Sequence, residues 1–173
     1  MQRHLAALRG KRGRLDILIA NVEKTIREMK GEAIMTDEEK FEVFKQELID
    51  GNEQKYGVEI RAKYGNYATL RSNAKVKGMS KEQYAEVERL SQELNGTLKA
   101  AFEQGDPSGE LAQKACELHK RWLCYFWDSY SKDAHMGVAQ TYVDDPRFTE
   151  YYDKIVPGCA VFLRDAINIY CGE

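Results

Sequence analysis

The chain of 173 residues has few residues that interrupt helices and lacks the patterns that build strands. Proline occurs only three times, at Pro107, Pro146 and Pro157, and runs in which β-branched and polar residues alternate are missing. Because half-buried strands need that alternation, the sequence predicts an all-α fold. Hydrophobic residues make up 43% of the chain and charged residues 31%, which is typical of a globular protein rather than a disordered one.

Long apolar runs and an export signal are also missing. No uncharged stretch approaches the roughly 20 residues that cross a bilayer. The N-terminal residues do not combine a charged region, an apolar region and a cleavage site. We therefore expect a cytoplasmic protein that does not contact membranes.

The sequence lacks the usual motifs of enzymes and metal sites. It has no G-x-S-x-G segment, no glycine-rich phosphate loop and only three histidines, none in an E-x-x-H or H-x-x-x-H pair. The four cysteines, which form no C-x-x-C pair, are Cys116, Cys124, Cys159 and Cys171. They are typical of reduced, buried thiols in a cytosolic protein. We expect no catalytic residue, no metal and no cofactor.

The N-terminal region predicts a long helix with a narrow apolar stripe. Apolar residues recur there at spacings of three and four, interrupted once by Arg12, at Leu5, Leu8, Leu15, Ile19, Val22, Ile26 and Met29. This spacing is the a and d pattern of a heptad repeat, and such a stripe is too narrow to pack into a globular core. We expect residues 1–31 to form a coiled coil that dimerises through Leu5, Leu8, Leu15, Ile19, Val22 and Ile26. An amphipathic helix folded onto its own domain is the alternative.

Capping residues and glycines divide the rest of the chain into shorter helices. The capping-box sequences TDEE and SKEQ predict helices that begin after Thr36 and Ser80. Glycines are expected to end helices. The expected helices span residues 36–49, 52–64, 67–77 and 80–104, with breaks at Gly65, Gly78 and Gly105. A linker is expected over residues 31–35.

Two more helices are expected near the C-terminus. Asp145 and Pro146 are suited to the N-cap and first position of a short helix. Pro157 is expected to begin the last helix.

The stretch WLCYFWDSY, residues 122–130, holds both tryptophans. On a helix from Leu118 to Tyr130, aromatic and apolar side chains would cover about 200° of the circumference. A surface helix buries little more than 100°, so this helix is expected either at the centre of the domain or between core and ligand cavity. Nucleic-acid stacking is disfavoured, because Asp128 and Asp133 follow the rings where phosphates would need basic residues. His119 lies within the arc, as a core residue or a ligand contact.

Most of the chain resembles one known family. The segment HKRWLCYFWDSYSKDAHMGVAQTYVDDPRFTEYYDKI, followed by PG and FLRDAI, resembles the C-terminal antibiotic-recognition domain of TipA-type regulators in the MerR family. MTDEEKFEVFK is similar to the first helix of that domain. KRGRLDILIANVEKTIREMKGE is similar to the end of the MerR dimerisation helix.

The resemblance implies a globin-like, haem-free helical domain over residues 36–173 that binds bulky hydrophobic antibiotics of the peptide type, such as thiopeptides. It also implies a transcription regulator that forms a homodimer through its N-terminal helix. DNA would be contacted only through a winged-helix head, which we expect to be absent from this chain. The alternative is a stand-alone protein that sequesters the antibiotic without binding DNA.

Aromatic and histidine side chains are expected to contact the ligand. The predicted ligand-binding residues are His119, Trp122, Phe126, Trp127, Tyr130, His135 and Tyr142. Rings supply apolar contact area, and histidines orient polar groups. TipA-type domains resemble this sequence around His135 but carry cysteines at the positions of Tyr130 and Gly137, where a thiol can trap a dehydroalanine-bearing antibiotic. Because neither position is cysteine here, we expect non-covalent binding.

Overall fold

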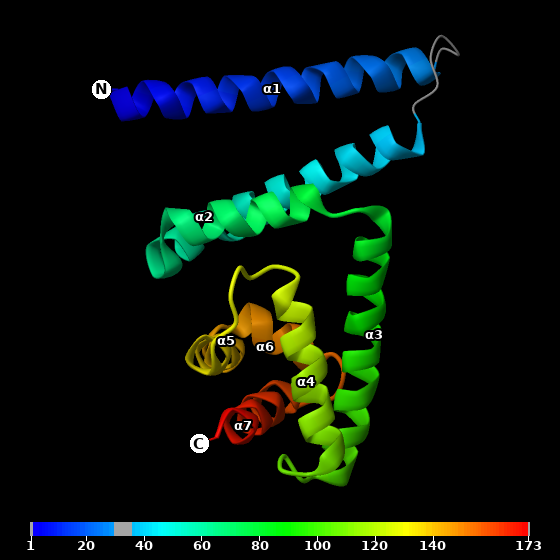
Figure 1. Cartoon of the computed structure of the whole chain (residues 1–173), viewed down its shortest axis with the longest axis vertical. Coiled ribbons are helices and arrows are strands. Elements are labelled where there is room, and N and C mark those ends of the chain that lie inside the picture. Colours follow the sequence, from blue (N-terminus) through cyan, green and yellow to red (C-terminus); the bar gives the residue numbers. More distant parts are fainter. Residues whose placement is uncertain (1, 30–35, 173) are drawn as a thin grey trace. The chain divides into compact units, whose positions relative to one another are not determined.

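The computed structural model describes residues 2–29 and 36–172. Within these ranges the chain forms seven α-helices and no strand, which confirms the predicted all-α fold (Figure 1). The helices are α1 (Gln2–Met29), α2 (Asp37–Gly78), α3 (Lys81–Gln104), α4 (Glu110–Cys124), α5 (Lys132–Asp144), α6 (Pro146–Asp153) and α7 (Cys159–Cys171). The linker predicted at residues 31–35 lies outside the described residues.

The chain divides into two compact units, Met1–Gly57 and Val58–Glu173. Within the first unit, an ion pair between Lys24 and Glu39 connects α1 with the start of α2. The second unit contains the rest of α2 and all later helices. The predicted division into residues 1–31 and 36–173 stays a prediction, as does the globin-like arrangement of the second part.

The apolar stripe of α1 is exposed. The exposed fractions are 57% for Leu15, 55% for Ile19, 58% for Val22 and 45% for Ile26. The side chains of Leu5 and Leu8 lie outside the described part of the chain. These four described side chains are therefore not packed within the first unit, and the coiled coil itself stays a prediction.

The predicted capping boxes mark the starts of α2 and α3. The Glu39 N–H donates to Thr36 Oγ1 at 3.2 Å, and Glu39 Oε2 accepts from the Thr36 N–H at 2.9 Å. Ser80 and Gln83 make the same reciprocal pair before α3. Each box satisfies backbone N–H groups that have no partner within the first turn of a helix.

Helix α2 is interrupted at Gly65, where φ is 81° and ψ is 161°. Glycine adopts this positive φ without strain because it has no Cβ atom. The Thr69 hydroxyl donates to the Gly65 carbonyl at 3.2 Å as the helix resumes. The predicted break at Gly65 is confirmed. The predicted break before Asn52 is wrong: α2 continues through Gly51, since an interior glycine costs only about 1 kcal/mol relative to alanine.

Helices α3 and α4 run side by side in opposite directions (Figure 1). Gly105 ends α3 as predicted, and its N–H donates to the Phe102 carbonyl at 3.0 Å. Helix α7 packs against both α4 and α5, and α6 packs against α5 and α7. The fully buried large side chains at the centre are Leu90, Leu98, Cys116, His119, His135, Cys159, Leu163 and Ile167.

The two C-terminal helices begin at different kinds of residue. Asp145 caps α6 through its side chain and Pro146 is the first residue, as predicted. The prediction that Pro157 begins the last helix is wrong, because α7 begins at Cys159. The preceding Gly158 has a φ of 90°, which a right-handed helix cannot contain.

Candidate functional site

Two histidines meet inside the second unit. His119 of α4 and His135 of α5 are both fully buried, with exposed fractions of 0%. His119 Nδ1 lies 2.7 Å from His135 Nε2, and the two rings stack with centroids 5.0 Å apart. A buried polar group needs a partner to offset the loss of its water contacts. Each ring provides that partner for the other.

Tyrosine hydroxyls extend the histidine pair at both ends. The Tyr142 hydroxyl lies 3.0 Å from His119 Nε2, and the Tyr152 hydroxyl lies 3.5 Å from the same nitrogen. At the other end, the Tyr130 hydroxyl lies 3.0 Å from His135 Nδ1. The result is a hydrogen-bonded chain from Tyr142 through the two buried histidines to Tyr130, here called the histidine chain.

The histidine chain is electrically neutral at pH 7. Burial lowers the pKa of His119 to about 3, and the neighbouring His135 acts in the same direction. Burial also lowers the pKa of His135 to about 4; Lys120 adds to this shift and Glu117 opposes it. With neutral rings, either His119 donates to His135 or His135 donates to His119, and both directions satisfy every bond of the chain.

A layer of rings covers one side of the histidine chain. Trp122 stacks on His119 with ring centroids 6.1 Å apart and an interplanar angle of 19°. Phe126 packs against Trp122 with centroids 4.8 Å apart. Trp122, Phe126 and Tyr130 are half-buried. These rings therefore combine apolar area with partial access from solvent, as ligand contacts require.

The segment that carries these rings is not one helix. The prediction of a continuous helix from Leu118 to Tyr130 is wrong, because α4 ends at Cys124. The last turn tightens, with Phe126 N–H donating to the Leu123 carbonyl at 2.9 Å. Residues 125–131, here called the aromatic loop, then lead to α5. The expected arc of about 200° therefore applies only up to the end of α4.

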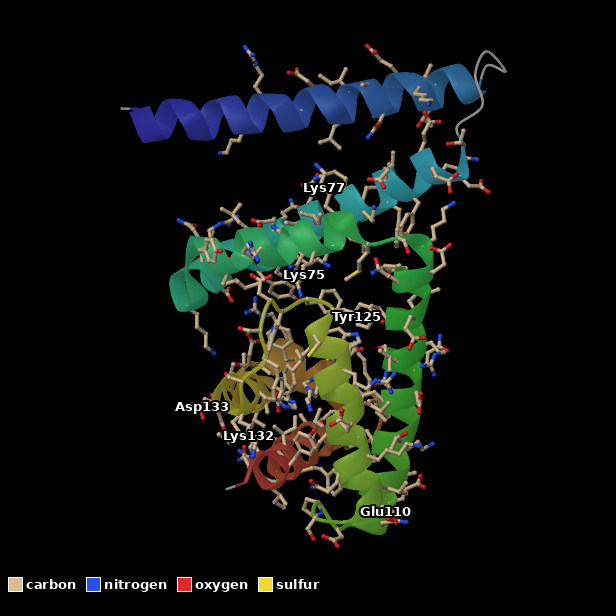
Figure 2. All side chains as sticks on the ribbon, viewed as in Figure 1. Lys75, Lys77, Glu110, Tyr125, Lys132 and Asp133 are labelled. Atoms are coloured by element: carbon tan, nitrogen blue, oxygen red, sulfur yellow. The ribbon has the colours of Figure 1, made fainter. Side chains whose placement is uncertain are left out.

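Helix α2 supplies the partners that hold the aromatic loop. Lys75 Nζ donates to the Cys124 carbonyl at 3.2 Å and to the Trp127 carbonyl. Arg71 Nε pairs with Asp128 Oδ2 at 2.6 Å, and this hydrogen bond lowers the pKa of Asp128. Figure 2 labels Lys75 and Tyr125, and shows that they lie near each other where α2 passes the end of α4. The carbonyl that would continue α4 is thus bonded to α2.

The structure gathers most of the predicted ligand-binding residues. Direct ring contacts or hydrogen bonds connect His119, Trp122, Phe126, Tyr130, His135 and Tyr142. Trp127 follows Phe126 in the aromatic loop, and its backbone carbonyl accepts from Lys75 of α2 rather than from any of these residues. His119, His135 and Tyr142 are buried core residues, whereas the other four are half-buried. Their role in ligand binding stays a prediction.

Sequence reasoning missed three residues around this cluster. Tyr152 reaches the histidine chain from α6, and Arg71 and Lys75 reach the aromatic loop from α2. The doubled tyrosine at residues 151–152 could have suggested Tyr152. The sequence shows no comparable signal for Arg71 and Lys75, which lie about 50 residues before the loop.

The four cysteines are unpaired, and three of them are buried. Burial raises the pKa of Cys116 to about 12 and that of Cys159 to about 11, so neither forms a thiolate at neutral pH. Cys124, at the end of α4, is exposed. Among the described residues, no three His, Cys, Asp or Glu side chains are grouped to hold a metal ion. Nor does any described helix have the length and apolar character needed to cross a membrane.

Comparisons with known proteins place this arrangement in context. The family described as the TipAS antibiotic-recognition domain matches residues 56–170. The chain is 30% identical to the HTH-type transcriptional activator TipA of Streptomyces coelicolor, over 96% of the chain and 65% of TipA. It is 24% identical to the HTH-type transcriptional activator mta of Bacillus subtilis, over 99% of the chain and 66% of mta. The chain thus spans just under two thirds of the length of these relatives.

A solved structure is also similar. TipAS from Streptomyces lividans, in complex with nosiheptide, matches with a TM-score of 0.60 and 29% sequence identity. The match covers 80% of this chain and 95% of that one. TipAS belongs to a thiopeptide antibiotic multidrug resistance system of that organism.

Proposed function

Because the chain belongs to the family of TipAS antibiotic-recognition domains, we propose that it binds thiopeptide-type antibiotics as the effector-binding part of a transcription regulator. It is a binding protein rather than an enzyme, and it acts in the cytoplasm. Regulation requires a DNA-binding part. The relatives TipA and mta are named HTH-type after such a part. Ligand binding in the second unit is then transmitted to that part through the dimer.

The observation that carries this proposal is the ring layer on the histidine chain. Trp122, Phe126 and Tyr130 are half-buried and connected to buried groups, so they form a supported aromatic surface rather than isolated exposed rings. A thiopeptide presents flat heteroaromatic rings, for which such a surface provides stacking partners. The hydroxyl of Tyr130 adds a polar group for orientation.

Nosiheptide is the first ligand to test. We expect it to change the tryptophan fluorescence of the chain, because both tryptophans belong to or adjoin the ring layer. Phe126→Ala should raise the Kd at least about tenfold, the loss typical of a ring at the centre of an interface. Tyr151→Ala, which removes an exposed ring from α6, is the matched control and should leave the Kd within about threefold of wild type. Equal effects of the two substitutions would place the ligand elsewhere.

The same mixture tests whether binding is covalent. Tyr130 and Gly137 replace the family cysteines, and burial keeps Cys116 and Cys159 protonated by raising the pKa of each. The intact mass of the chain should therefore be unchanged after incubation with nosiheptide and removal of free ligand. A mass increase equal to the antibiotic would contradict non-covalent binding, and peptide mapping would then show whether Cys124 had reacted.

We further propose that α1 forms a homodimer through its exposed stripe. Ile19→Asp should convert the dimer to monomers in sedimentation experiments, because a buried carboxylate at an a or d position has no partner. Ala20→Asp adds the same charge one residue outside the stripe and should leave the dimer intact. If Ile19→Asp remains dimeric, the interface lies on another surface.

A further inference from the structure

Charge is segregated between the end of α2 and the helices that follow. Residues 60–78 contain five lysines and arginines and no aspartate or glutamate. Residues 79–173 contain 16 acidic residues and ten basic ones. The second half of α2 is therefore attracted to the rest of its unit.

The basic residues of α2 make specific contacts rather than a general charge pairing. Lys75 bonds the carbonyls of Cys124 and Trp127, and Arg71 bonds the carboxylate of Asp128. These acceptors are the last residue of α4 and two neighbouring residues of the aromatic loop. Two adjacent turns of α2 therefore hold the same short piece of chain.

The histidine chain holds the end of the aromatic loop. The Tyr130 hydroxyl is bonded to His135, which is fully buried. Without Lys75, the loop would keep its backbone bonds to Leu123 and its bond at Tyr130, but it would lose the side-chain contact that joins its beginning to α2. Phe126 and Trp127 lie in that first part of the loop.

We propose that Arg71 and Lys75 are positioning residues that fix the aromatic loop and thereby set the affinity for the antibiotic. Only the effect on antibiotic affinity rests on the proposed function; the effect on the loop does not. Lys75 donates to two carbonyls that lie where the regular hydrogen-bond pattern of α4 ends. Arg71 pairs with the carboxylate of Asp128 within the aromatic loop.

Other contacts also join this part of α2 to the rest of its unit. Lys63 donates to Thr141 Oγ1 at 2.6 Å, and Glu59 pairs with Arg147 at the start of α6. Lys75→Met leaves both of these contacts in place.

The loop is tested first in the free protein, with the two tryptophans replaced by 5-fluorotryptophan. Each labelled tryptophan gives one fluorine NMR signal. The signal that disappears in Trp127→Phe belongs to Trp127, and the other belongs to Trp122. Lys75→Met, which keeps the methylene stem, should shift and broaden the Trp127 signal more than the Trp122 signal. Lys75→Arg should restore it, since a guanidinium also donates to carbonyls. Lys99→Met, an exposed lysine of α3, is the matched control and should move neither signal. A Trp127 signal that is the same in Lys75→Met and wild type overturns the inference.

Affinity for nosiheptide is tested next. Lys75→Met should raise the Kd about fivefold, consistent with the loss of one partly exposed charged contact, and Lys99→Met should not change it. For the other pair, Arg71→Asp and Asp128→Arg should each weaken binding, and the double exchange should recover most of the loss. A wild-type Kd in Lys75→Met, or a double exchange no better than the single ones, counts against the positioning role.

The two proposals fail in different ways. If the wild-type chain binds no nosiheptide, the proposed function is contradicted, while the fluorine signals of the free protein still decide whether Arg71 and Lys75 fix the loop. If the wild-type chain binds and Lys75→Met behaves like it in both experiments, the proposed function stands and the positioning inference is wrong.

Discussion

His119→Ala is expected to lower the free energy of unfolding by about 3 to 5 kcal/mol, measured by chemical denaturation. The substitution removes a fully buried ring and leaves a cavity between α4 and α5. It also leaves His135 Nε2 and the Tyr142 hydroxyl without their partner. Each buried polar group left unpaired costs about 1 to 3 kcal/mol, so the loss should exceed that of an apolar truncation.

A double-mutant cycle separates the hydrogen bonds from the cavity. Tyr142→Phe removes only the hydroxyl and should lower the free energy of unfolding by about 1 to 2 kcal/mol. His119→Ala combined with Tyr142→Phe should be less destabilised than the sum of the two, because both remove the same bond. Strict additivity, or a His119→Ala loss below about 1 kcal/mol, would show that the histidine chain contributes little to stability.

Acid should begin to destabilise the protein at pH values well above those at which carboxylates titrate. The unfolded chain binds protons on His119 and His135 near pH 6.5, whereas burial lowers their folded pKa values to about 3 and 4. Between these limits the unfolded state binds more protons, so stability is full above pH 6.5 and falls as the pH falls. The expected slope is about 1.4 kcal/mol per pH unit for each histidine below about pH 6.

Denaturation curves at about pH 7, 6, 5 and 4.5 measure this slope. His135→Gln should reduce it by about half, since one of the two depressed groups is gone. Carboxylates whose pKa is lowered in the folded state, such as Asp128 and Asp145, act in the same direction but mainly below about pH 4. A flat profile between about pH 6.5 and 4.5 would show that the histidines are protonated within the folded protein.

The helix boundaries that the sequence predicts correctly depend on local chemistry. The capping box at Thr36, the break at Gly65, the end of α3 at Gly105 and the proline at the start of α6 each involve residues within one turn of each other. Such interactions can be predicted because the residues involved are close together in the sequence. Gly51 shows the limit of this reasoning, because the cost of an interior glycine is small enough for the packing of the whole helix to outweigh it.

The features that could not be predicted depend on contacts between distant parts of the chain. Nothing near Cys124 in the sequence stops α4; the carbonyl there is bonded to Lys75, 49 residues earlier. Likewise, His119 and His135 are 16 residues apart on separate helices, and their pairing follows from how α4 and α5 pack. The resemblance to a known family selects candidate residues, but only the fold shows that both histidines belong to the core.

Cys124 also makes this protein convenient to label. The other three thiols are buried, so a maleimide dye added to the folded wild-type chain should react at Cys124 without any cysteine being removed first. That position is the last residue of α4 and adjoins the aromatic loop, so the label reports on the loop rather than on the core. Energy transfer from the two tryptophans to such a dye would follow loop movement in real time.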